Sequence, residues 1–369
     1  MNVSGIIFAS DNEVKLNELT IHRTTASLPF GGRYRMIDFA LSNFVNNGIS
    51  KVGIITKNSY NSLMDHIRMG RDWDLNRKNS GITVFPPFGG SSFKEVYRDK
   101  IEALYSILNY LRRSKEEYVM IVNGNVAINI NLEGFFEEYK QKRADIMILC
   151  HRERTTSCKR VVLETDADCR VNDLMISNSI STEEKLVSLN AYFMHRDLLC
   201  GLIEGAYTRN MVDFERDILL KKLTSLNIYA YEYEGYAAII DNVKTYYTES
   251  MRLLDHEVRD DLFLRNGKIV TKVKDSSPTV YKDTANVKGS LVADGCVIEG
   301  TVENSILFRN VKVRKGAVVK NSIIMEYGVV GENASLSYVV TDKGVDVSDN
   351  RVLAGYETYP IVIVKDKKV

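Results

Sequence analysis

Two different hydrophobic rhythms divide the chain. Up to about residue 255, short apolar runs alternate with stretches that carry apolar residues at helical spacing. The apolar runs, which suit buried parallel strands, are Val3–Ala9, Lys51–Thr56, Tyr118–Val122 and Asp145–Cys150. The helical stretches between them are Ile37–Asn47, Ser62–Met69, Ile101–Arg113 and Leu132–Lys142. This alternation predicts an α/β, Rossmann-like sheet with helices on both faces, in which ligands bind at the carboxyl ends of the strands.

From about residue 285 the rhythm becomes shorter. The fragments GSLV (289–292), NSIL (304–307), NSII (321–324) and LSYV (336–339) recur every 15 to 17 residues, and Val318, Ile324, Val330 and Leu336 are six positions apart. A hexapeptide rhythm predicts a parallel β-helix, with an antiparallel sandwich of short strands as the alternative. We therefore expect an α/β domain over 1–255, a linker over 256–284 and a β-helix over 285–369.

Composition narrows the range of partners and compartments. A formal net charge of +1 gives no bulk attraction to nucleic acid or to an acidic membrane surface, so we expect neither partner. The five cysteines include no CxxC pair and the sequence contains no HExxH motif, which argues against a disulfide framework and a zinc site. The apolar start lacks a basic segment and is too short to span a bilayer, so we interpret it as a first strand and expect a cytoplasmic protein.

One segment carries a family resemblance. Residues 29–39 read PFGGRYRMIDF and are followed by LSN (41–43) and NGI (47–49). Taken alone, the two glycines would permit a tight turn that aims Arg33 and Arg35 at an anion, or the segment is a structural turn with solvated arginines. Together with WD (73–74) and the terminal repeats, it resembles bacterial glucose-1-phosphate adenylyltransferases (ADP-glucose pyrophosphorylases). The resemblance implies a nucleotidyltransferase domain followed by a left-handed β-helix, and assembly into tetramers.

The phosphate-binding chemistry of that family is missing from the matching positions. The family has a glycine-rich AGGxGxRL loop after the first strand, whereas residues 9–16 read ASDNEVKL. The glycines are gone, Asp11 and Glu13 add negative charge beside the place of a triphosphate, and the family arginine is matched by Lys15. The GTADA-like segment of the family is matched by DKIEA (99–103).

The two metal ligands of the family are also replaced. Family members bind Mg²⁺ through an aspartate of an SGDH-like turn and a second aspartate of a GYWxDVGT-like segment. The resemblance places the neutral Asn125 and the apolar Ile239 at these positions, and Mg²⁺ prefers oxygen ligands that include one or two carboxylates. Asp241 could substitute only after a register shift. We therefore expect no metal site, no cofactor and no catalytic residue in this chain.

Some family positions are retained, and they define two candidate sites. A vestigial substrate pocket would contain Tyr97, Asn123, Asp213, Arg216 and Asp217. Arginines near the β-helix junction bind anionic effectors in the family, so Arg23 and Arg35, together with Arg33, are candidates for a phosphate or sugar-phosphate effector. The alternative for these arginines is a set of structural salt bridges.

This chain has lost the phosphate loop and both metal ligands together. In this respect it resembles the GlgD-type subunits of the family. The resemblance implies a regulatory subunit of glycogen biosynthesis that assembles with a catalytic ADP-glucose pyrophosphorylase subunit in a heterotetramer, with a homo-oligomer as the alternative for the chain in isolation. A weak adenylyltransferase in its own right remains the main alternative. A hexapeptide-repeat acyltransferase is disfavoured because the last histidine, His256, precedes the repeats.

Overall fold

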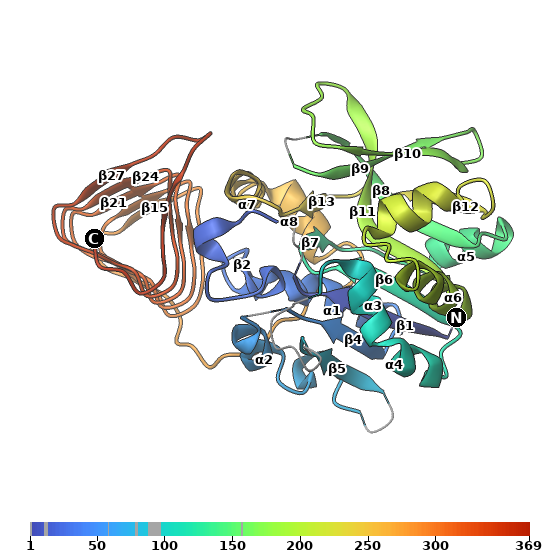
Figure 1. Ribbon diagram of the computed structural model, residues 1–369. Helices are drawn as coiled ribbons and strands as arrows, with labels where there is room; N and C mark the ends of the chain where they lie inside the picture. Colours follow the sequence, from blue (N-terminus) through green and yellow to red (C-terminus); the bar gives the residue numbers. More distant parts are fainter. Residues whose placement is uncertain (1, 11–13, 58, 78–79, 88–96, 156–157) are drawn as a thin grey trace.

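The amino-terminal part is built on a mixed, mainly buried β-sheet (Figure 1). The computed structural model describes residues 2–10, 14–57, 59–77, 80–87, 97–155 and 158–369. The main path of the sheet runs β10-β9-β11-β6-β1-β4-β5, and β8 and β12 extend it beside β11. Its strands are β1 (Val3–Phe8), β4 (Lys51–Ile55), β5 (Gly81–Phe85), β6 (Tyr118–Asn123), β8 (Ile146–Arg154), β9 (Arg160–Thr165), β10 (Val171–Ser177), β11 (Glu184–His195) and β12 (Ile228–Glu232).

Helices cover both faces of this sheet, as the hydrophobic pattern predicts. Alternate strand residues point to opposite faces, so Ile7 packs with one set of helices and Ile6 with the other. The first set is α1 (Met36–Asn46), α2 (Asn61–Ile67) and α5 (Glu133–Gln141). The second set is α3 (Lys100–Ser106), α4 (Leu108–Arg113), α6 (Arg196–Tyr207) and the π-helix η4 (Glu215–Leu220). The helix expected over 101–113 is divided at Ile107, whose backbone leaves helical geometry.

Short elements complete the α/β domain, and several of them share a hydrophobic cluster with the β-helix. They include two small antiparallel pairs, in which β2 pairs with β3 and β7 with β13. The elements are β2 (Pro29–Phe30), β3 (Tyr34–Arg35), β7 (Val126–Ile128), β13 (Ala237–Ile239), α7 (Val243–Arg252), α8 (His256–Phe263) and the 3₁₀ turns η1 (Asn17–Leu19), η2 (Thr25–Ser27) and η3 (Arg71–Trp73).

The carboxyl-terminal part is a left-handed parallel β-helix of three five-stranded sheets (Figure 1). The first sheet is β14 (Val280–Tyr281), β17 (Val297–Ile298), β20 (Lys312–Val313), β23 (Val329–Val330) and β26 (Asp346–Val347). The second is β15 (Asn286–Lys288), β18 (Thr301–Glu303), β21 (Val318–Lys320), β24 (Ser335–Ser337) and β27 (Val352–Ala354). The third is β16 (Leu291–Val292), β19 (Ile306–Leu307), β22 (Ile323–Ile324), β25 (Val339–Thr341) and β28 (Ile361–Ile363).

The segment expected as a linker over 256–284 has more structure than the sequence indicated. Its first part is α8, whose Phe263 stacks on Tyr34 with ring centroids 4.7 Å apart. Its last part contains β14, which pairs with β17 and so belongs to the first coil of the β-helix. Residues 264–279, between these two elements, and residues 282–284, after β14, lie outside helices and strands. The aromatic and strand contacts explain the difference, because the stack on Tyr34 holds α8 against the α/β domain and the pairing with β17 holds β14 on the β-helix.

In the described part of the chain, no helix is both long enough and apolar enough to cross a membrane.

Candidate functional site

The three degenerate positions of the expected active site come together in space. β7 and β13 pair so that Val126 lies opposite Ile239. At the start of this ladder, the Asn125 amide donates to the carbonyl oxygen of Ile240 over 3.0 Å, and the backbone N–H of Ile240 donates to the carbonyl oxygen of Asn125 over 2.9 Å. Lys15 reaches the same turn, where its backbone N–H donates to the carbonyl oxygen of Asp241 over 2.6 Å. Asp11 and Glu13 lie outside the described residues.

The side chains at the two metal positions do not fit Mg²⁺. Ile239 is apolar and 5% exposed. Asn125 is buried, and its Oδ1 accepts no hydrogen bond within the described chain, so the pair offers one neutral oxygen and no carboxylate. Mg²⁺ in proteins is usually bound by one or two carboxylates. Among the described residues, no group of three or more histidine, cysteine, aspartate or glutamate side chains is arranged to hold a metal ion.

Asp241, the carboxylate closest in sequence to Ile239, is engaged by an arginine. Arg160 donates from Nη1 to Asp241 and from Nε to Glu153, the latter over 2.7 Å, while Thr245 donates to the other Asp241 oxygen over 3.0 Å. Arg160 and Asp241 are both buried. Burial opposes the charge on Arg160, but the two carboxylates outweigh it and raise its pKa.

On the nucleotide side of the expected pocket, the described residues make internal contacts with one another. At the carboxyl end of β1 and the start of α3, the described residues enclose a cavity of only about 10 Å³. Beside it, Lys100 forms a 2.5 Å ion pair with the buried Glu215, which also accepts a hydrogen bond from the Tyr192 hydroxyl over 2.9 Å. Tyr97 is buried nearby and donates to the carbonyl oxygen of Pro86 over 3.4 Å.

The retained Asp213, Arg216 and Asp217 make local structural contacts at the start of η4. Asp213 accepts from the backbone N–H of Arg216 over 2.8 Å and from Lys159 over 3.0 Å. Asp217 accepts from the backbone N–H groups of Val212 and Asp213, and Lys221 pairs with it over 3.0 Å. Burial opposes ionisation of Asp217, yet Lys221 and these amides hold its pKa below the usual range. The Arg216 guanidinium is 60% exposed.

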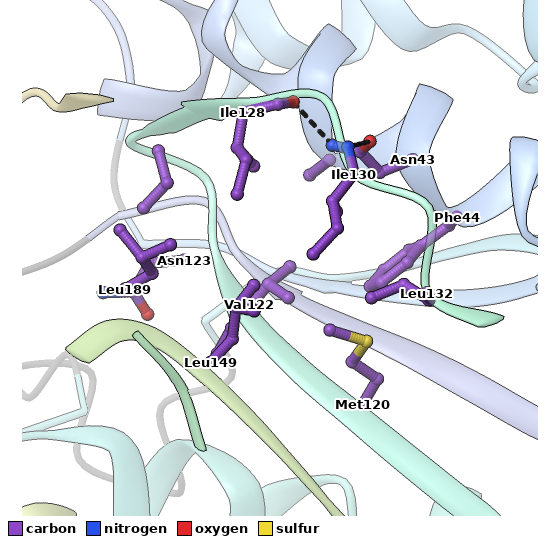
Figure 2. A pocket seen from close by; sticks show the side chains of 13 residues that line it. Asn43, Phe44, Met120, Val122, Asn123, Ile128, Ile130, Leu132, Leu149 and Leu189 are labelled. Carbon is purple, nitrogen blue, oxygen red and sulfur yellow. Dashed lines mark hydrogen bonds between the residues drawn. The ribbon is translucent and has the colours of Figure 1, made fainter. Parts of the chain in front are cut away.

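Asn123 faces a different space, a small apolar cavity between α1 and the sheet (Figure 2). The cavity has a volume of about 40 Å³, and side chains such as Phe44, Met120 and Leu149 line it. Asn43 lies at its edge and joins α1 to the segment after β7, because its amide donates to the Ile128 carbonyl oxygen and its Oδ1 accepts from the Ile130 backbone N–H. A cavity this small and apolar does not accommodate a nucleotide or a sugar phosphate.

The three candidate effector arginines separate into two groups. Arg23 is 4% exposed and forms an ion pair with Asp342 of the β-helix over 2.7 Å, which is the arrangement that the salt-bridge alternative describes. Arg33 and Arg35 instead line a cavity of about 480 Å³ between the two domains. The β2–β3 turn positions them, and Gly31 and Gly32 both have positive φ there (59° and 83°), a conformation that glycine adopts without steric cost.

This junction cavity is rich in positive charge. The lining residues that the sequence did not indicate come from helix α2, from the segment before the β-helix and from the β-helix coils, and they are Asp65, His66, Lys272, Lys274, Arg309, Glu326, Tyr327, Lys343, Gly344, Lys365 and Asp366. Glu326 pairs with Lys274 over 3.2 Å and with Lys343 over 2.8 Å. These residues carry no local motif, so only their convergence in the fold identifies them.

The pKa values of Lys343, Arg35 and Lys272 in this cavity are lowered by burial and by the positive charges next to them. Burial, and next the charge of Arg35, lower the pKa of Lys343 to about 8. Burial also lowers the pKa of Arg35, and burial followed by the charges of Arg68 and Arg35 lowers that of Lys272. For Glu326 burial acts in the opposite direction, but Lys343 and Lys274 hold its pKa at about 2. An anion in the cavity would relieve this repulsion, and that makes the cavity a candidate anion site.

Comparison with known proteins agrees with this architecture. Residues 4–175 match the nucleotidyl transferase family, and residues 276–358 match the GlmU-like C-terminal hexapeptide family. The glycogen biosynthesis protein GlgD of Bacillus subtilis is 37% identical over 362 residues, which cover 98% of this chain and 95% of the relative. GlgD of Geobacillus stearothermophilus is 39% identical over 85% of this chain and 82% of its own length. Glucose-1-phosphate adenylyltransferase of the same organism is 32% identical over 86% of this chain and 82% of its own. The chain therefore belongs to the glucose-1-phosphate adenylyltransferase family, in which it is a relative of the GlgD type.

Proposed function

We propose that this chain is a regulatory subunit of ADP-glucose pyrophosphorylase in glycogen biosynthesis, with little or no catalytic activity of its own. The observation that carries the proposal is the pairing of Asn125 with the Ile239–Ile240 strand end, which leaves a neutral amide and an alkyl group where the family binds Mg²⁺. In the family, Mg²⁺ neutralises phosphate charge during nucleotidyl transfer. This chain supplies no carboxylate pair at those positions to hold it.

The internal contacts of the described residues on the nucleotide side support the same proposal. Glu215 is buried and is paired with the partly buried Lys100 and with the Tyr192 hydroxyl, so a substrate that separated these groups would expose or strand a charge that is now paired. Breaking a buried ion pair costs about 3–5 kcal/mol. Substrate binding in the family geometry would have to supply that free energy before any chemistry began.

The regulatory part of the proposal rests on the junction cavity. Arg33, Arg35 and Lys343 line it, and the last of these comes from the β-helix. A phosphate or sugar-phosphate effector bound there would contact both domains at once. We propose a cytoplasmic assembly with a catalytic subunit, as a heterotetramer, in which this cavity tunes the effector response.

Three preparations test the proposal: this chain alone, its catalytic paralogue alone, and the two co-purified. We expect no ADP-glucose synthesis from this chain alone, and a higher rate or an altered effector response from the mixture. Metal-dependent synthesis by this chain alone would favour the second candidate, a weak adenylyltransferase. A mixture that behaves as the paralogue alone would remove the regulatory role.

A further inference from the structure

Arg160 joins three elements at the place where a metal would be expected. It begins β9, and its guanidinium contacts Glu153 near the end of β8 and Asp241 in the turn between β13 and α7. Asp241 follows Ile239 by two positions and its backbone oxygen accepts a hydrogen bond from the Lys15 N–H, and Arg160 and Ile239 line the same cleft. The Arg160 guanidinium is therefore a cation that already lies between Asp241 and Glu153 and belongs to the chain itself.

We propose that Arg160 is a built-in cation that replaces a divalent metal at this site, and that its removal would create a metal site from Asp241 and Glu153. The two carboxylates flank one guanidinium, Glu153 at Nε and Asp241 at Nη1, so both face the volume that the guanidinium occupies. Thr245 adds a hydroxyl oxygen 3.0 Å from Asp241 Oδ1. Oxygen donors of this kind, completed by water, are the ligands that Mg²⁺ and Mn²⁺ take.

The surroundings give a cation access to this volume. Arg160, Glu153, Ile239 and Thr245 all line one cleft of about 450 Å³, and the Glu153 side chain is 22% exposed. Shortening Arg160 would therefore open the carboxylates to solvent and not leave a sealed void. The replacement also explains why Asp241 tolerates its burial, because an isolated buried carboxylate is strongly disfavoured.

Binding of Mn²⁺, followed by the loss of its free electron paramagnetic resonance signal, tests the proposal. We expect wild type to bind Mn²⁺ weakly and Arg160→Ala to bind one ion per chain about tenfold tighter or more. Arg160→Lys keeps the charge and should behave as wild type. Arg160→Ala combined with Asp241→Asn should lose the gain. Equal Mn²⁺ binding by wild type and Arg160→Ala, or a gain that survives Asp241→Asn, would overturn the proposal.

Two measurements keep the test decisive if Arg160→Ala folds poorly. Its refolding yield should rise with Mn²⁺ and stay low with EDTA, and a yield indifferent to Mn²⁺ would contradict the proposal. The melting temperature of wild type should not change between Mn²⁺ and EDTA, whereas an increase abolished by Asp241→Asn would mean that the native site already holds metal. The proposal rests on the proposed function only in taking the native site as metal-free. Its readouts are metal binding and stability, so an active wild type would overturn the function without deciding the role of Arg160.

Discussion

The pKa of a single residue, Lys343, is set by groups from both sides of the domain junction. It projects from the β-helix into the cavity that Arg35 enters from the other domain, and Glu326 is its 2.8 Å partner. Burial and the neighbouring arginines lower its pKa to about 8, so its ammonium group loses its proton within the range in which proteins are handled. Anion binding at the cavity should therefore depend on pH.

We expect sulfate affinity to fall as pH rises through about 8. Sulfate keeps its charge over this range, so the change reports the protein, and the neutral amine above the pKa no longer attracts an anion. A charge-assisted hydrogen bond contributes about 1.5–3 kcal/mol, so the loss should be roughly tenfold or more. Isothermal titration calorimetry at several pH values measures it. Lys343→Met should bind weakly with no step near pH 8, and Lys312→Met, an exposed lysine outside the cavity, should match wild type. A step that persists in Lys343→Met would contradict the assignment.

Sequence reasoning located the degenerate positions but not the residues that surround them. Asn125 and Ile239 were identifiable because the family resemblance matches residues 123–126 to an SGDH-like turn and residues 235–242 to a GYWxDVGT-like segment, and the structure brings the two segments together. Arg160 carried no such signal, since it is 81 positions from Asp241 and belongs to no motif. The junction lysines were missed for the same reason. A cluster of charges from distant segments forms only when the domains pack together. A single sequence does not indicate which distant segments will meet in this way.

At the scale of elements, the β-helix coils show which buried positions a six-residue periodicity predicts correctly and which it does not. The six-residue step predicted inward positions at Val318, Ile324, Val330 and Leu336, and the last three are buried. In β21 the buried residue is Val319, while Val318 is partly exposed. Coil lengths vary between 15 and 17 residues, so a strict step of six drifts by one position at a corner.

We expect Val319→Ala to destabilise the protein by about 2 kcal/mol or more. Two methyl groups leave the core at about 0.8 kcal/mol each, and a cavity remains in a narrow column that cannot collapse. Val318→Ala, the same change one residue earlier, should cost clearly less. Chemical denaturation of the two variants measures the two losses of stability. Equal losses would mean that the assignment of Val319, and not Val318, to the inside of the β-helix is wrong.

A glycine-to-alanine substitution should have opposite effects on stability at Gly5, where β1 packs on α1, and at Gly201 in α6. A Cβ at Gly5 would lie 2.3 Å from Cε2 of the buried Phe44 ring, whereas a Cβ at Gly201 in α6 meets no heavy atom of the described residues within 4 Å. Gly5→Ala should therefore destabilise by about 1–3 kcal/mol, because the ring must shift. Gly201→Ala should stabilise by about 0.5–1 kcal/mol, since alanine favours the helix. Thermal unfolding distinguishes them, and a neutral Gly5→Ala would show that Phe44 moves freely into the adjacent cavity.

At the scale of the whole molecule, buried groups hold the two domains together. Phe30 and Tyr246 share one hydrophobic cluster with Ile306 and Met325 of the β-helix. Arg23 and Asp342 form an ion pair within this interface, with side chains 3% and 2% exposed. The α/β domain and the β-helix therefore pack as one body, which an effector at the junction would contact from both sides.

We expect Asp342→Asn to cost about 3–5 kcal/mol of stability, because it leaves the buried Arg23 charge uncompensated. The matched control is Glu204→Gln, which breaks the pair with Arg112 in which both side chains are 49% exposed. That change should stay within about 0.5 kcal/mol. Denaturant midpoints measure both, and similar small losses would indicate that Arg23 reaches solvent when Asp342 is neutral.

We propose above all that catalysis in the assembly belongs to the partner subunit. The most direct test purifies the hetero-oligomer with a catalytic subunit whose metal-binding aspartates have been replaced, and measures ADP-glucose synthesis with Mg²⁺ present. Any turnover above background in that assembly must come from this chain. We predict none, together with full assembly by size-exclusion chromatography. Mg²⁺-dependent turnover would contradict the account and place a working active site around Asn125 and Ile239.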